Sequence, residues 1–195
     1  FRKELENKGV LVKPNNPRIK KYTLYAANRG VASSQIYVRH DGDFKPLKDP
    51  DIFRKIPTKK GETIDLIDTI LNFKETDLLV VRAGSHSAKI YNHDGLQANI
   101  SCYNLNLKNY CSYNFDRRKG DPLGYYKDSS LAKLLDGKPH SSSEWLKATA
   151  DKYYPDGVVA LSQIFNDGRA GDMFVTTINK WGFRKVKEGN HGGAS

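Results

Sequence analysis

The chain has 195 residues, with 32 Lys and Arg against 22 Asp and Glu, so its formal net charge at pH 7 is +10. This length suits one globular domain or a large piece of a bigger one, and the 38% hydrophobic content is enough for a folded core. Apolar runs stay far below the ~18 residues that a membrane-spanning helix needs, so such a helix is excluded. Two cysteines exclude a disulfide scaffold and a four-cysteine zinc site, and leave open one pairing, Cys102 with Cys111.

The N-terminal third predicts part of a sheet followed by an irregular connection. Alternating apolar and polar residues predict strands at 22–25 and 34–39, with a further short strand at 11–12. Three prolines and several lysines between residues 41 and 60 indicate a solvated connection, with one helical turn at 51–55.

The middle of the chain predicts an α/β unit and then a hairpin. Apolar residues recur within 63–71 at the spacing of one buried helical face, which predicts a helix. The apolar run at 78–82 is typical of a strand covered on both faces. Segments 89–91 and 97–100 predict a hairpin, because the Asp-Gly pair at 94–95 supplies the positive φ that a tight turn requires.

The last part of the chain is predicted to be largely helical. The tyrosine-rich segment 103–113 first predicts another strand at an edge of the sheet. Ser and Glu at capping-box spacing in 141–144 predict a helix that ends before Pro155, and Asp156 is placed to cap a second helix. The clearest strand pattern lies at 171–178. Together these elements predict an α/β fold with a mixed sheet and flanking helices.

The five histidines are the natural candidates for metal binding, because imidazole binds transition metals near neutral pH. Four lie in turns or before a helix cap and are read most simply as solvated loop residues, namely His40, His86, His93 and His140. None has a second histidine two to four residues away, so no local histidine chelate is predicted. His191 differs, because glycines surround it and let the backbone approach an ion closely. A flexible glycine tail is the alternative reading of the same residues.

Two further features have both a structural and a functional interpretation. The run 116–121 places three cations beside Gly120, which suits a phosphate contact but is more typical of a solvated loop. Asp172 opens the last predicted strand, where a carboxylate either orients a ligand or, more commonly, caps the turn. The sequence contains no nucleophile elbow, phosphate-binding Gly-Lys-Ser loop or dinucleotide fingerprint.

A series of motifs near the C-terminus carries a resemblance to a known family. Tyr-Pro-Asp opens 154–159, Gln-Ile-Phe follows at 163–165, Arg-Ala-Gly-Asp opens 169–175, and a glycine-flanked histidine lies in 189–193. This series resembles the C-terminal signature of the alkaline phosphatase superfamily, and most closely its type I phosphodiesterase and nucleotide pyrophosphatase branch.

Earlier segments resemble the same branch in order and approximate spacing. They are a turn at 27–32 with the strand at 36–38, the strand at 77–82, and a Gly-Asp-Pro-Leu-Gly-Tyr loop at 120–125. The resemblance implies the C-terminal part of an alkaline-phosphatase-like fold. Residues 1–195 are therefore expected to form a single domain or the C-terminal fragment of a larger metallohydrolase domain.

The resemblance also implies a function. Enzymes of this branch hydrolyse phosphate esters with two zinc ions and a Thr or Ser nucleophile, and the glycine-flanked histidine is a late zinc ligand. His191 is therefore expected to bind zinc. The nucleophile and most ligands precede the region that resembles this chain, and no Asp-His-Gly segment occurs here. We expect the isolated chain to be inactive, because one imidazole does not hold zinc tightly.

The positive charge has two interpretations that do not depend on the resemblance. Basic clusters beside many tyrosines are typical of a module that binds nucleic acid or another polyanion. These clusters fall in different loops, so such binding would be unspecific and strongly salt-dependent. A basic surface that serves only solubility is the other possibility.

Overall fold

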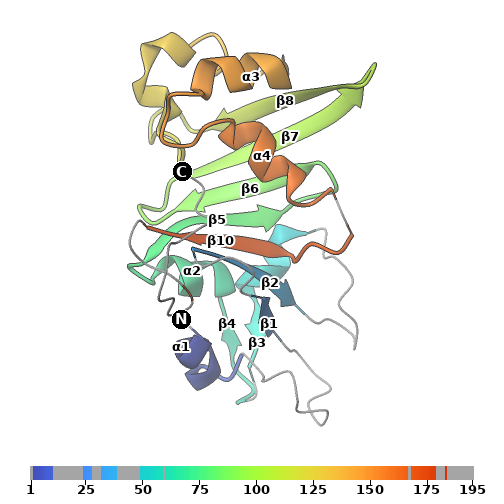
Figure 1. The fold of residues 1–195 in the computed structure, drawn as a ribbon. Helices are drawn as coiled ribbons and strands as arrows, with labels where there is room; N and C mark the ends of the chain where they lie inside the picture. The colour runs from blue at the N-terminus through green and yellow to red at the C-terminus, as the bar shows by residue number, and fades with distance from the viewer. Residues whose placement is uncertain are drawn as a thin grey trace, which may run out of the picture.

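The computed structural model describes residues 2–10, 24–27, 32–38, 49–58, 60–166, 168–178 and 183. Within this part, eight strands form one sheet in the order β1-β2-β10-β5-β6-β7-β8-β9 (Figure 1). The strands of this sheet are β1 (Leu24–Ala27), β2 (Ser33–Val38), β10 (Met173–Thr177), β5 (Thr76–Arg82), β6 (Ser87–Asn92), β7 (Gln97–Leu105), β8 (Lys108–Phe115) and β9 (His140–Ser141). A separate two-stranded ladder joins β3 (Ile56–Pro57) and β4 (Thr63–Ile64).

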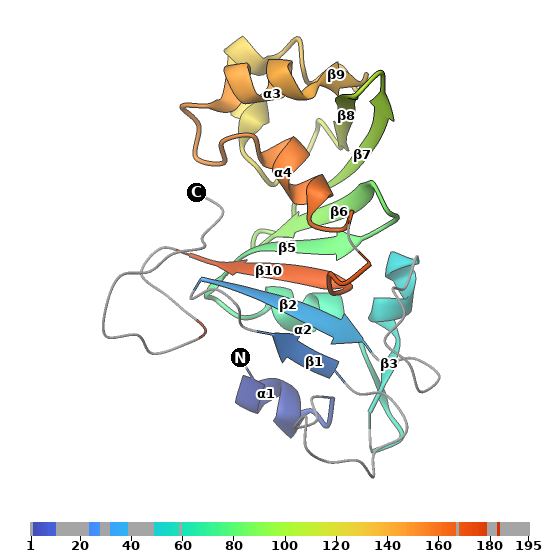
Figure 2. The ribbon, with the colours of Figure 1, turned by 45° about the vertical axis from the view of Figure 1, so that its right-hand side comes forward.

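Helices cover the sheet from both sides, as the sequence predicts. The α-helices are α1 (Arg2–Asn7), α2 (Leu66–Leu71), α3 (Ser142–Thr149) and α4 (Gly157–Gln163), and the 3-10 helices are η1 (Pro50–Arg54), η2 (Tyr125–Lys127) and η3 (Ser129–Leu131). In Figures 1 and 2, α3 and α4 lie beside β6, β7 and β8, whereas α1 lies near β1 at the other end of the sheet. Helix α2 contacts β5. None of the helices in the described ranges combines the length and the apolar character that a bilayer crossing requires.

The prediction of a mixed sheet is wrong, because every strand pairing among the described residues is antiparallel. Strands β5 to β8 follow one another through short connections, which impose antiparallel neighbours. Strands β2 and β5 run in the same direction, but β10 enters between them and pairs with both. Met173 lies opposite Ile36 on one side and opposite Val81 on the other. The α/β character is thus confirmed, with a sheet that is antiparallel.

Strand β5 lies at the centre of the core and is buried on both faces, as its apolar run predicts. Leu78 and Val80 belong to one hydrophobic cluster, which includes Trp145 of α3 and Val158 of α4. Leu79 and Val81 belong to a second cluster with α1, α2 and η1. Alternate side chains of one strand therefore join two cores.

The predicted helix at 63–71 begins three residues later than expected. Ile64 pairs with Ile56 in the β3–β4 ladder, and Asp65 then caps α2 by accepting a hydrogen bond from the backbone N–H of Asp68 at 2.9 Å. The helical turn at 51–55 is confirmed as η1. The strand at 34–39 is confirmed as β2, and that at 22–25 corresponds in part to β1. The strand at 11–12 lies outside the described residues.

Two hairpins follow β5, where one was predicted. The β6–β7 hairpin turns at the Asp-Gly pair, with Gly95 at φ 76°, as predicted. The segment 103–113 is not a single edge strand, because the chain reverses again at Asn106 and Leu107 and makes β7 and β8 a second hairpin. Cys102 and Cys111 lie opposite each other in this ladder and form a disulfide.

The C-terminal helices agree with the prediction at their N-termini and are shorter than predicted. Both hydrogen bonds of the capping box between Ser141 and Glu144 are present, and α3 ends at Thr149. Asp156 immediately precedes α4, but its carboxylate makes no capping bond and its φ is 53°. The predicted strand at 171–178 is confirmed as β10.

Candidate functional site

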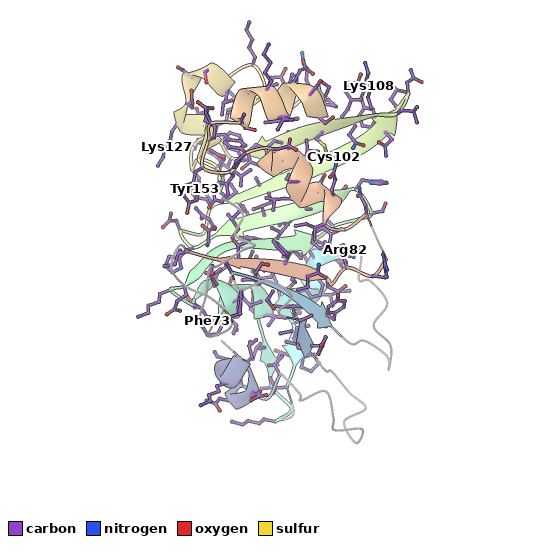
Figure 3. All side chains as sticks on the ribbon, in the orientation of Figure 1. Phe73, Arg82, Cys102, Lys108, Lys127 and Tyr153 are labelled. Carbon is purple, nitrogen blue, oxygen red and sulfur yellow. A yellow bond between two sulfur atoms is a disulfide. The ribbon has the colours of Figure 1, made fainter. Side chains whose placement is uncertain are left out.

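A concave pocket of about 440 Å³ lies at one end of the sheet. Three segments line it: the β6–β7 turn at 92–96, the loop from Arg117 to Lys127 after β8, and Tyr153 with Tyr154 between α3 and α4. Figure 3 places Lys127 and Tyr153 on the same side of the molecule. We call this site the basic tyrosine pocket, and its volume is typical of small-molecule sites.

The pocket lining carries more positive than negative charge. Its cations are Arg117, Arg118, Lys119 and Lys127, and its carboxylates are Asp94 and Asp121. Arg118 pairs with Asp116 at 3.2 Å, and the hydrogen bonds from Arg118 lower the pKa of this carboxyl group. Lys119 and Lys127 make no ion pair with any described residue, so both charges are available to an anion.

Asp121 is only 4% exposed, and its carboxylate is engaged in hydrogen bonds within the protein. It accepts hydrogen bonds from the backbone N–H groups of Tyr125 (3.1 Å) and Tyr126 (2.8 Å) and from the hydroxyl of Tyr113 (3.0 Å). Burial, followed by the charge of Asp121, raises the pKa of Tyr113, so this hydroxyl remains a donor. Asp121 therefore fixes the turn that carries Tyr126 and Lys127.

Aromatic rings lie beside the cations of the pocket. Tyr126 and Tyr153 are about half exposed, and the Tyr153 ring meets that of Tyr154 edge to face with 4.7 Å between centroids. The guanidinium carbon of Arg117 lies 6.0 Å from the centre of the Tyr126 ring. Cations next to flat apolar surfaces suit a ligand that joins an anionic group to a ring or an alkyl chain.

A chain of hydrogen bonds anchors the inner wall of the pocket to the sheet. The Tyr154 hydroxyl donates to Oδ1 of Asp77 at 2.6 Å, and Thr176 of β10 donates to Oδ2 of the same carboxylate at 3.1 Å. The Tyr125 hydroxyl donates to the backbone carbonyl of Tyr154 and accepts from the N–H of Gly157 at 3.2 Å. A Cβ at Gly157 would lie 2.8 Å from this hydroxyl oxygen, so the contact requires glycine.

The tyrosines of this wall are donors and not bases at neutral pH. Burial and the neighbouring Asp77 raise the pKa of Tyr154, and burial raises the pKa of Tyr125. Among the described residues, the pocket lining contains no Ser, Thr, Cys or His. The arrangement can bind and orient an anionic ligand through its cations and aromatic rings.

The predicted zinc ligand His191 lies outside the described residues, as does the whole segment 189–193. Within the described ranges, no three His, Cys, Asp or Glu side chains come together as a group that could hold a metal ion. The described residues thus provide no ligand set for zinc, and zinc binding by His191 stays a prediction.

Three of the other histidines form hydrogen bonds, and His40 lies outside the described residues. His86 and His93 lie in loops, as predicted, whereas His140 belongs to β9 and its ring lies edge-on to that of Trp145. His86 Nδ1 lies 2.9 Å from the side-chain oxygen of Asn166, and His93 Nδ1 lies 3.1 Å from the carbonyl oxygen of Leu71. His140 Nε2 lies 2.9 Å from Oδ1 of Asp136. Asp136 lies four residues before His140 in the sequence. No third ligand joins this pair in the described part.

Asp172 immediately precedes β10, and a ligand-orienting role for its carboxylate stays a prediction. Its Oδ2 accepts a hydrogen bond from the backbone N–H of Val38 at 2.8 Å, so it connects the start of β10 to β2. Arg82 lies nearby and donates to the backbone carbonyls of Phe165, Ala170 and Gly171. Both buried charged groups are therefore part of the framework.

The basic run 116–121 was interpreted mainly as a solvated loop, and its cations are indeed exposed, but they line the pocket. The sequence signal was three cations beside Gly120, which adopts a φ of 101°. No comparable sequence pattern pointed to Tyr126, Lys127 or Tyr153, because these residues come together only in the folded chain.

Comparison with protein-family models, with curated proteins and with solved structures found no match for this chain.

Proposed function

We propose that this chain binds phosphate esters in the basic tyrosine pocket, as the C-terminal segment of a metal-dependent phosphodiesterase or pyrophosphatase. The proposal rests on the position of Lys119 and Lys127. In the described part of the chain neither lysine has an ion-pair partner, and both line one pocket with exposed tyrosine rings. A phosphate diester presents the matching chemistry, an anionic phosphorus centre with ring or alkyl substituents.

Contacts between the motif segments support the phosphodiesterase part of the proposal. The loop at 120–125 contacts the segment at 154–159 through the Tyr125 hydroxyl. Tyr154 in turn bonds to Asp77, the first residue of the strand motif at 77–82. Arg82, at the end of that motif, bonds to the carbonyl oxygens of residues 170 and 171. The motif segments that carry the family resemblance are thus in contact with one another, although they lie far apart in the sequence.

We assign the pocket a binding role and not the chemical step. Its lining contains no hydroxyl nucleophile other than tyrosine, and the raised pKa of Tyr154 keeps that hydroxyl protonated. Its cations can hold the non-bridging phosphate oxygens while rings contact the substituents. In the proposed parent enzyme, the nucleophile and the remaining zinc ligands come from outside this chain.

A variant pair tests phosphate-ester binding. Lys119→Gln with Lys127→Gln removes two pocket charges, and Lys133→Gln with Lys138→Gln removes two exposed charges elsewhere. With bis(4-nitrophenyl) phosphate as the titrant, we expect the pocket variant to raise Kd by about tenfold, because each exposed charge contact contributes up to about 1 kcal/mol. The control variant should bind like the parent chain.

Equal loss of affinity in both variants would contradict phosphate-ester binding in the basic tyrosine pocket. It would favour attraction of the ligand by the net charge of the chain alone. The polyanion alternative predicts that result most clearly for a short oligothymidine, whose binding should also weaken steeply with added salt.

A further inference from the structure

The tip of the β7–β8 hairpin exposes apolar side chains at the end of the sheet opposite the pocket. Leu107 is fully exposed (105%), Leu105 is 53% exposed, and Tyr103 is 46% exposed. The ribbon of this hairpin extends to one side past α3, and Lys108 lies at its far end (Figures 1 and 3). No described residue buries the Leu107 side chain.

Leu107 also occupies a backbone conformation that disfavours leucine. Asn106 and Leu107 have φ values of 50° and 62°, as in a two-residue turn with both central residues left-handed. Asparagine tolerates this region, but the second position favours glycine, and a Cβ-bearing residue is destabilised there by about 1 kcal/mol. An exposed leucine at this position therefore stabilises neither the turn nor the core.

The hairpin is held firmly behind the tip. The Cys102–Cys111 disulfide joins its two strands, and the rings of Tyr103 and Tyr110 stack in the next pair, with 5.6 Å between their centroids. Leu105 is paired with Lys108 at the end of the ladder. Cross-strand pairs of this kind stabilise the hairpin, so the tip presents its side chains outward without folding back.

The charge of the hairpin fits an anionic surface. Residues 95–115 contain no Asp or Glu, although 28% of the whole chain is charged. Lys108 is the single charged residue in this range, and it lies beside Leu107 at the tip. A carboxylate here would be repelled by anionic lipid, whereas a lysine and a net charge of +10 are attracted to it.

We propose that the hairpin tip inserts Leu105 and Leu107 into the interfacial region of an anionic lipid bilayer, with the Tyr103–Tyr110 pair at the headgroup level and Lys108 against lipid phosphates. Tyrosine rings favour this interface, and a lysine reaches the headgroups while its stem stays in apolar surroundings. A bilayer accepts a convex apolar tip without a matching groove. A protein partner would need about 800 Å² of contact on each side, and a tip of a few side chains offers less.

The pocket stays accessible in this orientation. Strand β7 begins next to the pocket turn and ends at the tip, and its nine residues span about 30 Å. A ligand in water could therefore reach the basic tyrosine pocket while the tip is inserted. The insertion depends on the hairpin and not on phosphate-ester binding, so the two proposals can fail separately.

Vesicle sedimentation tests the insertion. The chain should bind vesicles of phosphatidylcholine with phosphatidylserine, and more weakly vesicles of phosphatidylcholine alone. Leu107→Gly keeps the turn and removes the apolar side chain, and should lower the partition coefficient about tenfold, in proportion to the apolar area of one leucine. Leu146→Asn changes another exposed leucine (52%), on α3 and away from the hairpin tip, and should leave binding unchanged.

Thermal unfolding should show that Leu107→Gly is at least as stable as the parent chain, which separates lost insertion from lost folding. Failure of the parent chain to bind either vesicle, or equal binding by Leu107→Gly, would overturn the proposal. Loss of oligothymidine binding in Leu107→Gly, with vesicle binding unchanged, would also overturn it and assign the tip to nucleic acid.

Discussion

Asp121→Ala is expected to lower the free energy of unfolding by about 3–5 kcal/mol, because it leaves two buried donors and one partly buried donor without an acceptor, and each buried donor costs about 1–3 kcal/mol. These donors are the N–H groups of Tyr125 and Tyr126 and the hydroxyl of Tyr113. Asp121 is almost completely buried, so water cannot replace the carboxylate without opening the turn. Urea unfolding of the parent chain and the variant measures the difference.

The other pocket carboxylate provides a matched control for this prediction. Asp94 is exposed in the β6–β7 turn, and its carboxylate accepts a hydrogen bond from the side-chain amide of Asn92 at 3.4 Å. Asp94→Ala should change the free energy of unfolding by no more than about 0.5 kcal/mol, as is usual for an exposed site. A loss below about 1 kcal/mol in Asp121→Ala would contradict the role of Asp121 as the anchor of the pocket loop.

A loss of stability at alkaline pH is the second large effect that we expect. Burial raises the pKa of Tyr113, Tyr125 and Tyr154 above the ordinary tyrosine value of 10.0. Above this value the unfolded chain releases these protons while the folded chain retains them, so the unfolded state binds fewer protons and stability falls as pH rises. Their contribution is fully present below about pH 10, and each tyrosine can remove about 1.4 kcal/mol per pH unit above it.

Urea unfolding between about pH 9 and pH 11 measures this slope, and tyrosinate absorbance reports the ionisation. Tyr125→Phe should make the slope shallower by about a third, because one of three protons no longer contributes. Tyr103→Phe, at an exposed ring, should leave the slope unchanged. Stability that stays constant over this pH range would contradict the protonated, hydrogen-bonded state of the three hydroxyls.

The sequence correctly predicted secondary-structure features that are determined by interactions between neighbouring residues. The capping box at 141–144 and the Asp-Gly turn at 94–95 each depend on a few adjacent residues, and both are present. The turn at 106–107 was missed because leucine is a poor residue for a left-handed position. Its stability comes from the strands on either side and from the disulfide behind it, which the sequence left open.

The sequence did not predict the order of the strands in the sheet, which depends on residues far apart in the chain. The strand pattern at 171–178 identified β10 but not its place between β2 and β5, which depends on pairings across more than ninety residues. The same topology assembles the pocket from three segments, and among them only the basic run near Gly120 was considered from the sequence as a phosphate contact. Zinc binding by His191 depends on the family resemblance and remains a prediction.

A crystal structure of the chain soaked with bis(4-nitrophenyl) phosphate is the most direct measurement of phosphate-ester binding. The expected result is a phosphate group in contact with the cations of the basic tyrosine pocket, with a nitrophenyl ring against Tyr126 or Tyr153. A pocket that holds only solvent at saturating ligand, or a phosphate bound at another site, would contradict the proposed function.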